Sequence, residues 1–243
     1  MSRRLAIDIG NTRLKIGIFS GNDLVMIDSR EVNEWDQSYI NGWYENFVPQ
    51  YVIVSSTIEL SAEAVKWMKK VRAFVVHPFL RYPFKISYKT PGTLGQDRLA
   101  AVSAVFSLYK KQNVLVIDAG TCITYDFLSS SGEYVGGNIS PGIQMRLAAM
   151  HYYTEKLPRV FMTGEIKWLG QSTEEAIRAG GGAMAIMEAR GMISYLEEKY
   201  GELTIVLTGG DYFYFLKYLE GEKFVEPNLV LLGLNEIMKN NEI

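Results

Sequence analysis

Two acidic turns, about 110 residues apart, carry the side chains with the clearest chemical potential. In each, an apolar run ends in Asp-x-Gly followed by a hydroxyl or amide residue, first over Leu5 to Thr12 and again over Val114 to Thr121. Glycine permits a tight turn whose backbone N–H groups can approach a phosphate. A carboxylate beside a phosphate needs a cation between the two charges. Asp8 and Asp118 therefore suit a phosphate site that works through cations.

A single Asp-x-Gly turn is also an ordinary structural turn. Here, however, each copy is followed by a second β-like run, over residues 14–19 and 123–128, and each opens one half of the chain. Duplicated lobes explain this repetition better than chance does. We therefore expect two similar lobes whose hairpins together hold the phosphate tail of a nucleotide.

A third candidate segment runs from Tyr88 to Arg98 and leads into an expected amphipathic helix through Tyr109. It places Asp97 at the N-terminus of that helix, where a carboxylate could simply stabilise the helix dipole while Arg98 pairs on the surface. A carboxylate following Gly95 at the mouth of an interlobe cleft could equally serve as a base for an acceptor hydroxyl. The pattern alone leaves both interpretations open.

Composition limits the class of function. The 243 residues carry 25 basic and 27 acidic side chains, a net charge of −2, without a basic run, so we expect no nucleic-acid partner. No apolar run is long enough to span a bilayer, so we expect no membrane partner. The one cysteine, Cys122, excludes an internal disulfide and suits a reducing cytoplasm.

Strand and helix patterns alternate along the chain, which indicates an α/β fold. We expect a first lobe over residues 1–112 and a second over 113–243, each opening with a meander of strands. Within them, Ser61 is expected to cap a helix over 61–70, Pro141 to lie in the first turn of a helix, and Ser172 with Glu175 to form a capping box. The glycines at 180–182 fall inside an expected helix from Thr173 to Tyr200, where close helix packing would explain them.

Taken together, these motifs resemble the type III pantothenate kinases, of the acetate and sugar kinase, heat-shock ATPase and actin superfamily. The resemblance covers nearly the whole chain. It rests on Asp8-x-Gly-Asn-Thr-x-x-Lys15, Tyr88-x-x-Pro91-x-x-Leu-Gly95-x-Asp97-Arg98, Asp118-x-Gly-Thr121, Gly136-Gly137-x-Ile-x-Pro141-Gly142 and Gly170-x-x-Thr173.

This resemblance implies two lobes of the ribonuclease H-like, actin-like ATPase type with an interlobe active-site cleft. It implies transfer of the γ-phosphoryl group of ATP to pantothenate, giving 4'-phosphopantothenate in the first step of coenzyme A biosynthesis. A cytoplasmic homodimer that uses Mg²⁺ and a monovalent cation, K⁺ or NH₄⁺, is implied as well.

The resemblance also assigns roles to individual residues. Asp97 would be the catalytic base, Asp118 would bind K⁺, and Asp8 would act through Mg²⁺. The nucleotide-binding positions are Asp8, Gly10, Asn11, Thr12, Lys15 and Thr121. The pantothenate-binding positions are Tyr88, Gly95, Gln96, Asp97, Arg98 and Thr173. Thr173 could instead be the cap of its helix.

Two alternatives remain at this point. One is another small-molecule kinase of the same superfamily, because nucleotide loops do not identify the acceptor. The other is a regulator that binds nucleotide without chemistry. Tyr88 and the Gly-x-Asp-Arg segment favour pantothenate, and an intact Asp97 favours a working enzyme.

Overall fold

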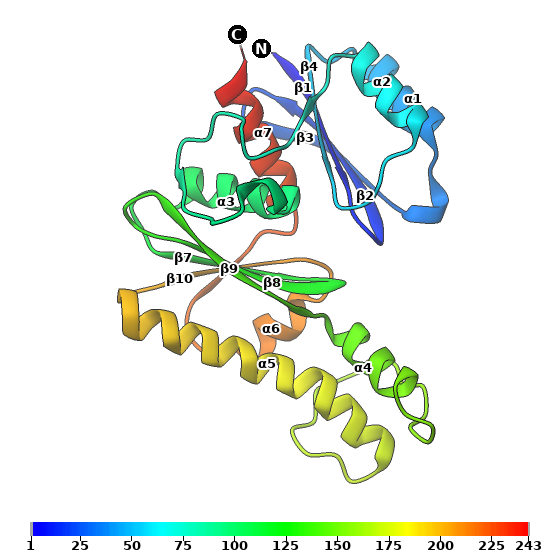
Figure 1. The fold of residues 1–243 in the computed structure, drawn as a ribbon, viewed down its shortest axis with the longest axis vertical. Coiled ribbons are helices and arrows are strands. Elements are labelled where there is room, and N and C mark those ends of the chain that lie inside the picture. The colour runs from blue at the N-terminus through cyan, green and yellow to red at the C-terminus, as the bar shows by residue number, and fades with distance from the viewer. Residues whose placement is uncertain (1, 243) are drawn as a thin grey trace. The chain divides into compact units, whose positions relative to one another are not determined.

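A computed structural model describes residues 2–242, which group by their contacts into two compact units (Figure 1). The first unit contains the chain up to Lys110, the short segment Gly132–Val135 and the chain from Asn228 onward. The second contains Lys111–Ser131 and Gly136–Pro227. Each unit is built on its own mixed sheet.

The first unit contains a five-stranded sheet in the order β3-β2-β1-β4-β5. Its central strand β1 is a continuous apolar run in which Leu5, Ala6 and Ile7 have no exposed surface, as a strand covered on both faces requires. β1 pairs antiparallel with β2 and parallel with β4. The strands are β1 (Arg3–Ile9), β2 (Arg13–Ser20), β3 (Asp23–Glu31), β4 (Tyr51–Ser56) and β5 (Phe74–Val75).

Two helices, α1 (Gln37–Phe47) and α2 (Ala62–Lys70), cover one face of this sheet (Figure 1). Their apolar side chains join alternate residues of β1 in one core cluster. The Ser61 side chain accepts a hydrogen bond from the backbone of Ala64, which confirms the predicted cap of α2. α1 begins at Gln37 because the Asp36 side chain accepts a hydrogen bond from the Tyr39 backbone N–H and caps the helix.

The other face is covered by α3 (Gln96–Leu108) and α7 (Leu229–Asn241), which pack closely against each other. A Cβ atom on Gly233 of α7 would lie 1.7 Å from the carbonyl oxygen of Ala100, so only glycine permits this contact. The prediction that α3 is amphipathic is wrong, since it is buried at every position from Arg98 to Val105. Its alanines let neighbouring backbones approach from several sides.

Five strands of the second, six-stranded sheet repeat the arrangement of the first, in the order β9-β8-β7-β10-β11, and the short strand β6 (Lys85–Ile86) is its edge strand beside β9. In both, the first strand pairs antiparallel with the second and parallel with the fourth. This repeated topology confirms the predicted α/β fold with two similar lobes. The strands are β7 (Val114–Ala119), β8 (Cys122–Leu128), β9 (Glu133–Pro141), β10 (Thr204–Thr208) and β11 (Lys223–Val225).

Three helices complete the second unit: α4 (Ile143–Tyr152), α5 (Thr173–Tyr200) and α6 (Tyr212–Tyr218). The glycine run in α5 serves close packing as expected, because a Cβ on Gly181 would lie 2.6 Å from Leu147 of α4. The helix prediction for Pro141 is wrong: this residue ends β9, and α4 starts after Gly142. Ser172 caps α5, but the Glu175 side chain accepts from the backbone of Gln171 rather than closing a capping box.

The contact-based units differ from a single division of the chain after residue 112. α7 groups with the first unit because it packs on α3 and β1. The segment Gly132–Val135 also groups there, because its residues Glu133 and Tyr134 pair with the short strand β6 (Lys85–Ile86).

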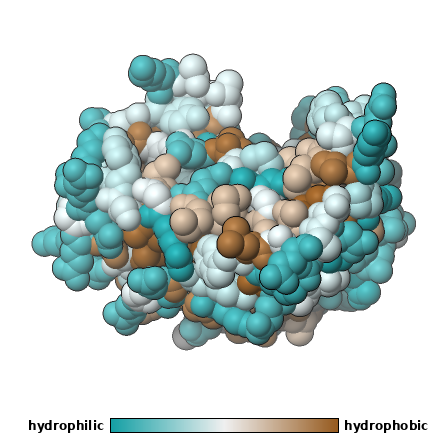
Figure 2. Space-filling view, turned by 90° about the horizontal axis from the view of Figure 1, so that it is seen from below, coloured by the Kyte–Doolittle hydropathy of each residue, from teal (hydrophilic) through white to brown (hydrophobic). Residues whose placement is uncertain are grey.

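Apolar side chains on the surface seen in Figure 2 occur in small groups between hydrophilic ones. Over residues 2–242, every helix is too short or too polar to cross a membrane.

Candidate functional site

The end of β1 places Asp8 between two neighbouring strands. In the sheet register Asp8 lies opposite Lys15 of β2 and Ser55 of β4. The turn that follows is closed by a 2.9 Å hydrogen bond from the Gly10 N–H to the Arg13 carbonyl. The hairpin therefore fixes a carboxylate, an ammonium group and a tight turn at one end of the sheet.

Asn11 and Thr12 occupy the exposed tip of this turn. The Asn11 amide donates to the Thr57 hydroxyl at 3.3 Å, and the Thr12 carbonyl accepts from the Val32 N–H at 3.0 Å. Both contacts hold the tip against neighbouring segments. The side chains remain accessible for the phosphate contacts that we predict.

Asp97, in the first turn of α3, interacts electrostatically with Asp8. Burial, together with the nearby Asp97 charge, raises the pKa of the Asp8 carboxyl to about 7, although Ser55 and Lys15 act in the opposite direction. One Asp8 oxygen is buried and forms no hydrogen bond with any described residue. Two neighbouring carboxylates, one with an unsatisfied buried oxygen, fit a divalent cation, which would relieve both the repulsion and the burial penalty.

Glycine is required at the start of α3. A Cβ on Gly95 would lie 2.6 Å from an Asp97 carboxylate oxygen. The same oxygen accepts a 2.9 Å hydrogen bond from the Arg98 N–H, which is the helix-terminus interaction considered above. Because Gly95 has no side chain, the Asp97 carboxylate can take this orientation.

Gln96 connects this helix to the sheet. Its side-chain oxygen accepts a 2.8 Å hydrogen bond from the backbone N–H of Ser56, at the end of β4. Since Ser55 on the same strand lies beside Asp8, the contact fixes Asp97 relative to Asp8. The sequence pattern offered no signal for this positioning role.

Arg98, Tyr88 and Tyr134 form a stack. The guanidinium carbon of Arg98 lies 5.9 Å from the centre of the Tyr88 ring, and the Tyr88 and Tyr134 rings are nearly parallel with centres 6.4 Å apart. Arg98 is only 4% exposed, so the alternative in which it pairs on the surface is wrong. Sequence reasoning missed Tyr134, because nothing in the pattern linked its strand to Tyr88.

Asp118 lies at the end of β7 in the second unit, in the place that Asp8 has in the first. Its register partners are Thr124 of β8 and Thr208 of β10. Gly209 has a left-handed backbone, and a Cβ there would lie 2.5 Å from an Asp118 carboxylate oxygen. The loop after β10 thus packs directly against the Asp118 carboxylate.

The second acidic turn is braced by the start of α4. The Gly120 N–H donates to the Cys122 carbonyl at 2.9 Å, which closes the turn, and the Gly142 N–H donates to the Thr121 carbonyl at 3.1 Å. A Cβ on Gly142 would lie 2.2 Å from the Gly120 oxygen. The Pro141-Gly142 motif therefore holds the backbone of this turn directly.

Thr173 is the first residue of α5 and is exposed. The alternative in which it caps the helix is wrong, because Ser172 accepts the capping hydrogen bond from Glu175 at 3.3 Å. Thr173 belongs to a different segment from the Asp118 turn. Its hydroxyl is not used as a cap.

Comparison with known proteins decides the family. The profile of the type III pantothenate kinases matches residues 4–195. A type III pantothenate kinase of Phocaeicola vulgatus is 41% identical over 240 residues, covering 98% of each chain, and one of Azobacteroides pseudotrichonymphae is 42% identical over 239 residues, covering 96% of this chain and 95% of the relative. The chain belongs to the type III pantothenate kinase family.

The fold of this type III pantothenate kinase chain is shared with more distant proteins. Component A of the (R)-2-hydroxyglutaryl-CoA dehydratase of Acidaminococcus fermentans superposes over 100% of both chains with a TM-score of 0.58 at 14% identity. The two lobes are of the ribonuclease H-like, actin-like ATPase type.

Metal ligands in this family member are sparse. No group of three or more His, Cys, Asp or Glu side chains within residues 2–242 could enclose a metal ion. A divalent cation at Asp8 would therefore take most of its ligands from nucleotide phosphates and water, as Mg²⁺ commonly does.

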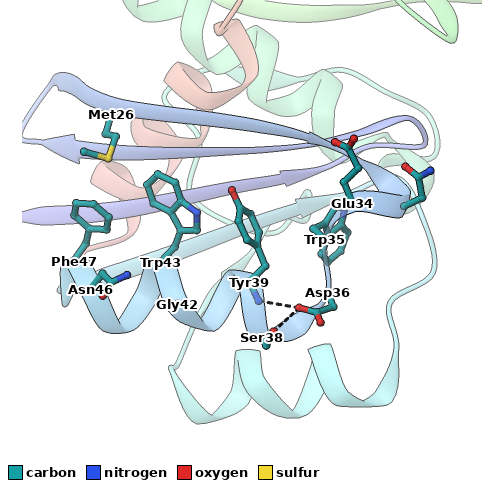
Figure 3. Close-up of a pocket in the computed structure, with 11 residues that line it drawn as sticks. Met26, Glu34, Trp35, Asp36, Ser38, Tyr39, Gly42, Trp43, Asn46 and Phe47 are labelled. Atoms are coloured by element: carbon teal, nitrogen blue, oxygen red, sulfur yellow. Dashed lines mark hydrogen bonds between the residues drawn. The ribbon is translucent and has the colours of Figure 1, made fainter.

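A groove in the first unit of this kinase-family chain lies elsewhere, between β3 and α1 (Figure 3). Its volume is about 820 Å³, and Met26, Trp43 and Phe47 line it together with Glu34 and Asp36. None of the predicted site residues lines it. Its lining includes acidic side chains but neither Lys nor Arg, so it does not suit a phosphate group.

Proposed function

We propose that this chain transfers the γ-phosphoryl group of ATP to the primary hydroxyl of pantothenate and forms 4'-phosphopantothenate, the first step of coenzyme A biosynthesis. The juxtaposition of Asp97 and Asp8 in the first unit carries the proposal. It supplies a base for an alcohol beside a carboxylate suited to the cation of a nucleotide. Membership of the type III pantothenate kinase family identifies the acceptor.

Asp97 is the proton acceptor. An aliphatic hydroxyl is a weak nucleophile, so a carboxylate that orients it and takes its proton as the new P–O bond forms accelerates attack on the phosphorus. Gly95 leaves space for that carboxylate, and Gln96 fixes its helix on β4. These contacts keep the base in position.

The pantothenate pocket is formed around the stack of Tyr88 and Arg98. Pantothenate carries a carboxylate, which the guanidinium of Arg98 can hold, and apolar methyl groups, which suit an aromatic ring. Gly95, Gln96 and Thr173 complete the proposed set. Among these, Gln96 contributes through its free amide N–H groups, because its oxygen is bonded to Ser56.

Each acidic turn is a phosphate-binding turn for the nucleotide. In the first turn, the phosphate oxygens are contacted by Gly10, Asn11, Thr12 and Lys15. In the second turn, they are contacted by Thr121. Asp8 would hold Mg²⁺ and Asp118 would hold K⁺ or NH₄⁺, and these cations would supply positive charge for the phosphoryl group. Lys15, opposite Asp8 in the sheet register, adds fixed positive charge to the first turn.

A homodimer is supported by the outer stripe of α5. Four small or flexible residues follow one another at helical spacing along the outer side of this helix, while the residues between them are largely buried: Gly180, Met184, Met187 and Gly191. Met184 is 47% and Met187 50% exposed. Small residues and flexible methionines suit packing against a second helix. The unpaired Cys122 is consistent with a cytoplasmic location.

ADP release measured with pantothenate, glucose, N-acetylmannosamine and acetate as separate acceptors tests the function. We expect turnover with pantothenate alone. A preference for a sugar or acetate would identify another kinase of the superfamily. Nucleotide binding without release for any acceptor would identify a regulator.

A further inference from the structure

A cluster of polar side chains in the second unit lies at the junction of β9 and α4, next to the turn that carries Thr121. Its members come from four elements: Tyr125 of β8, Ser140 of β9, Arg146 of α4 and Glu188 of α5. None of them belongs to the nucleotide or pantothenate positions proposed above. The question is what keeps four polar residues together in this part of the unit.

Arg146 holds the end of β9 by two hydrogen bonds and Glu188 of α5 by a third. Its Nε donates to the Pro141 carbonyl at 2.8 Å, and its Nη2 donates both to the Ser140 hydroxyl and to Glu188 Oε2, each at 2.6 Å. Its side chain is only 19% exposed. The guanidinium thus fixes two consecutive residues immediately before Gly142.

Glu188 orients Arg146. The same carboxylate oxygen that meets Arg146 accepts from the Ser140 hydroxyl at 3.0 Å. Burial tends to raise the pKa of Glu188, but the hydrogen bonds from Arg146 and Ser140 outweigh it, so this pKa lies below its usual value. Burial and the Glu188 charge raise the pKa of the nearby Tyr125 hydroxyl. Glu188 is therefore a charged carboxylate at neutral pH, hydrogen-bonded to Ser140 of β9 and Arg146 of α4.

The segment held by Arg146 leads directly to the second acidic turn. Gly142 follows Pro141, its N–H is bonded to the Thr121 carbonyl, and there is no space for a Cβ between it and Gly120. A movement of the Ser140-Pro141 backbone must therefore move Gly142 and, with it, the Gly120-Thr121 turn. Because this backbone is closely packed, a displacement of one segment is transmitted to the other.

We propose that Glu188 and Arg146 are positioning residues for ATP: they fix the Pro141-Gly142 backbone and thereby keep the Thr121 turn in the geometry that receives a phosphate. This inference rests on the proposed role of that turn in nucleotide binding. Neither Glu188 nor Arg146 contacts the nucleotide itself. Their effect reaches it through the backbone of β9 and Gly142.

The test compares KM for ATP and KM for pantothenate in Glu188→Gln, Arg146→Gln and the double variant. We expect each single variant to raise KM for ATP roughly tenfold, as a displaced loop does, while KM for pantothenate changes less than about twofold. Because both act through the same contact, the double variant should be no worse than the worse single one. Additive effects, or equal rises in both KM values, would overturn the proposal.

Two reference variants make the result specific. Glu165→Gln removes an exposed ion pair with Lys217 in the same unit and should leave both KM values unchanged. Thr121→Val tests the turn itself: if it leaves KM for ATP unchanged, the proposed role of the turn fails. If it raises KM for ATP while Glu188→Gln does not, only the positioning inference fails.

Thermal melting of each variant accompanies the kinetics. Should Glu188→Gln fail to fold, Ser140→Ala replaces it, because it deletes one hydroxyl of the cluster and leaves the ion pair in place. A rise of roughly threefold in KM for ATP is then expected, since one hydrogen bond is lost from the same cluster. No change with Ser140→Ala would count against the proposal.

Discussion

Asp97, in the first turn of α3, raises the pKa of Asp8 at the end of β1. The two carboxylates come from segments almost ninety residues apart in sequence. Like charges disfavour each other's ionised form unless a cation or a proton lies between them. This relationship gives Asp8 and Asp97 different expected behaviour when each is replaced by its amide.

Asp97→Asn keeps the shape of the side chain but cannot accept a proton. We expect kcat to fall roughly 10²- to 10⁴-fold, the usual range for loss of a general base. ATP affinity should change little, because the phosphate-binding turns are on other segments. Measured kcat, ATP binding and melting temperature on one preparation decide the matter, and a folded variant with near-normal kcat would exclude Asp97 as the base.

Asp8 should make stability depend on pH in metal-free protein. Its pKa is about 7 in the folded chain and 3.8 ordinarily, so the folded state retains a proton that the unfolded state releases in this window. The contribution of the protonated Asp8 carboxyl to the free energy of unfolding is fully present below about pH 4, and it is lost as pH rises through 7. In EDTA, Asp8→Asn should melt higher than the unchanged protein at pH 8, and the difference should shrink towards pH 4.

A melting difference between Asp8→Asn and the unchanged protein that stays constant from pH 4 to pH 8 would contradict this account. Adding Mg²⁺ and ATP at pH 8 provides a second check. The unchanged protein should gain more melting temperature than Asp8→Asn, because bound cation stabilises only the intact carboxylate.

Tyr134 should act on pantothenate through Tyr88. Its ring stacks on Tyr88, and its carbonyl accepts a 3.0 Å hydrogen bond from the Ser87 N–H. Tyr134→Leu removes the ring and should raise KM for pantothenate several-fold, about 1 kcal/mol for a lost aromatic contact, with KM for ATP unchanged. Tyr134→Phe keeps the ring and is the matched control. A parallel rise in both KM values would indicate general loss of structure.

Asp118 should make activity depend on a monovalent cation. We expect turnover to rise with K⁺ or NH₄⁺ over that in Tris or choline buffers, and Asp118→Asn to blunt the response. The carboxylate is the charged ligand at this position, so its amide should weaken cation binding. Titration of rate against K⁺ concentration measures the effect. Equal activity of the unchanged protein in all buffers would remove the cation from the mechanism.

The outer stripe of α5 should form a subunit contact. Light scattering at micromolar concentration is expected to give twice the mass of the 27.5 kDa chain. Met187→Glu places a charge in the stripe and should yield monomers, because an unpaired charge in an apolar contact is costly. Glu198→Gln, on the exposed last turns of the same helix, is the control. A monomer mass for the unchanged protein would refute the contact.

Local patterns allowed much of the fold to be predicted. The apolar run before Asp8 and its repeat before Asp118 predicted two central strands, and Ser61 predicted the start of α2, because these signals depend on a few adjacent residues. The burial of α3 could not be predicted, since it depends on Gly233 in a helix more than a hundred residues away. Pro141 suits a helix start as well as a strand end, and only the position of Gly142 decides between them.

The candidate site shows the same limit. Asp8, Asp97 and Asp118 stand out because each follows or precedes glycine in a recognisable motif. Ser55, Tyr134 and Glu188 have no such motif. Their proximity to the site arises from strand register and helix packing, which a single sequence does not encode locally.

The contact between Gly233 and Ala100 bears on how the molecule is made. A ribosome synthesises residues 111–227 before it reaches α7, so the second unit can acquire its sheet while the first still lacks a helix that covers α3. Until α7 emerges, the apolar side of the helix that carries Asp97 has no cover. The helix that carries the proposed base Asp97 therefore completes its packing only after α7 is made, although most of the first unit is translated earlier.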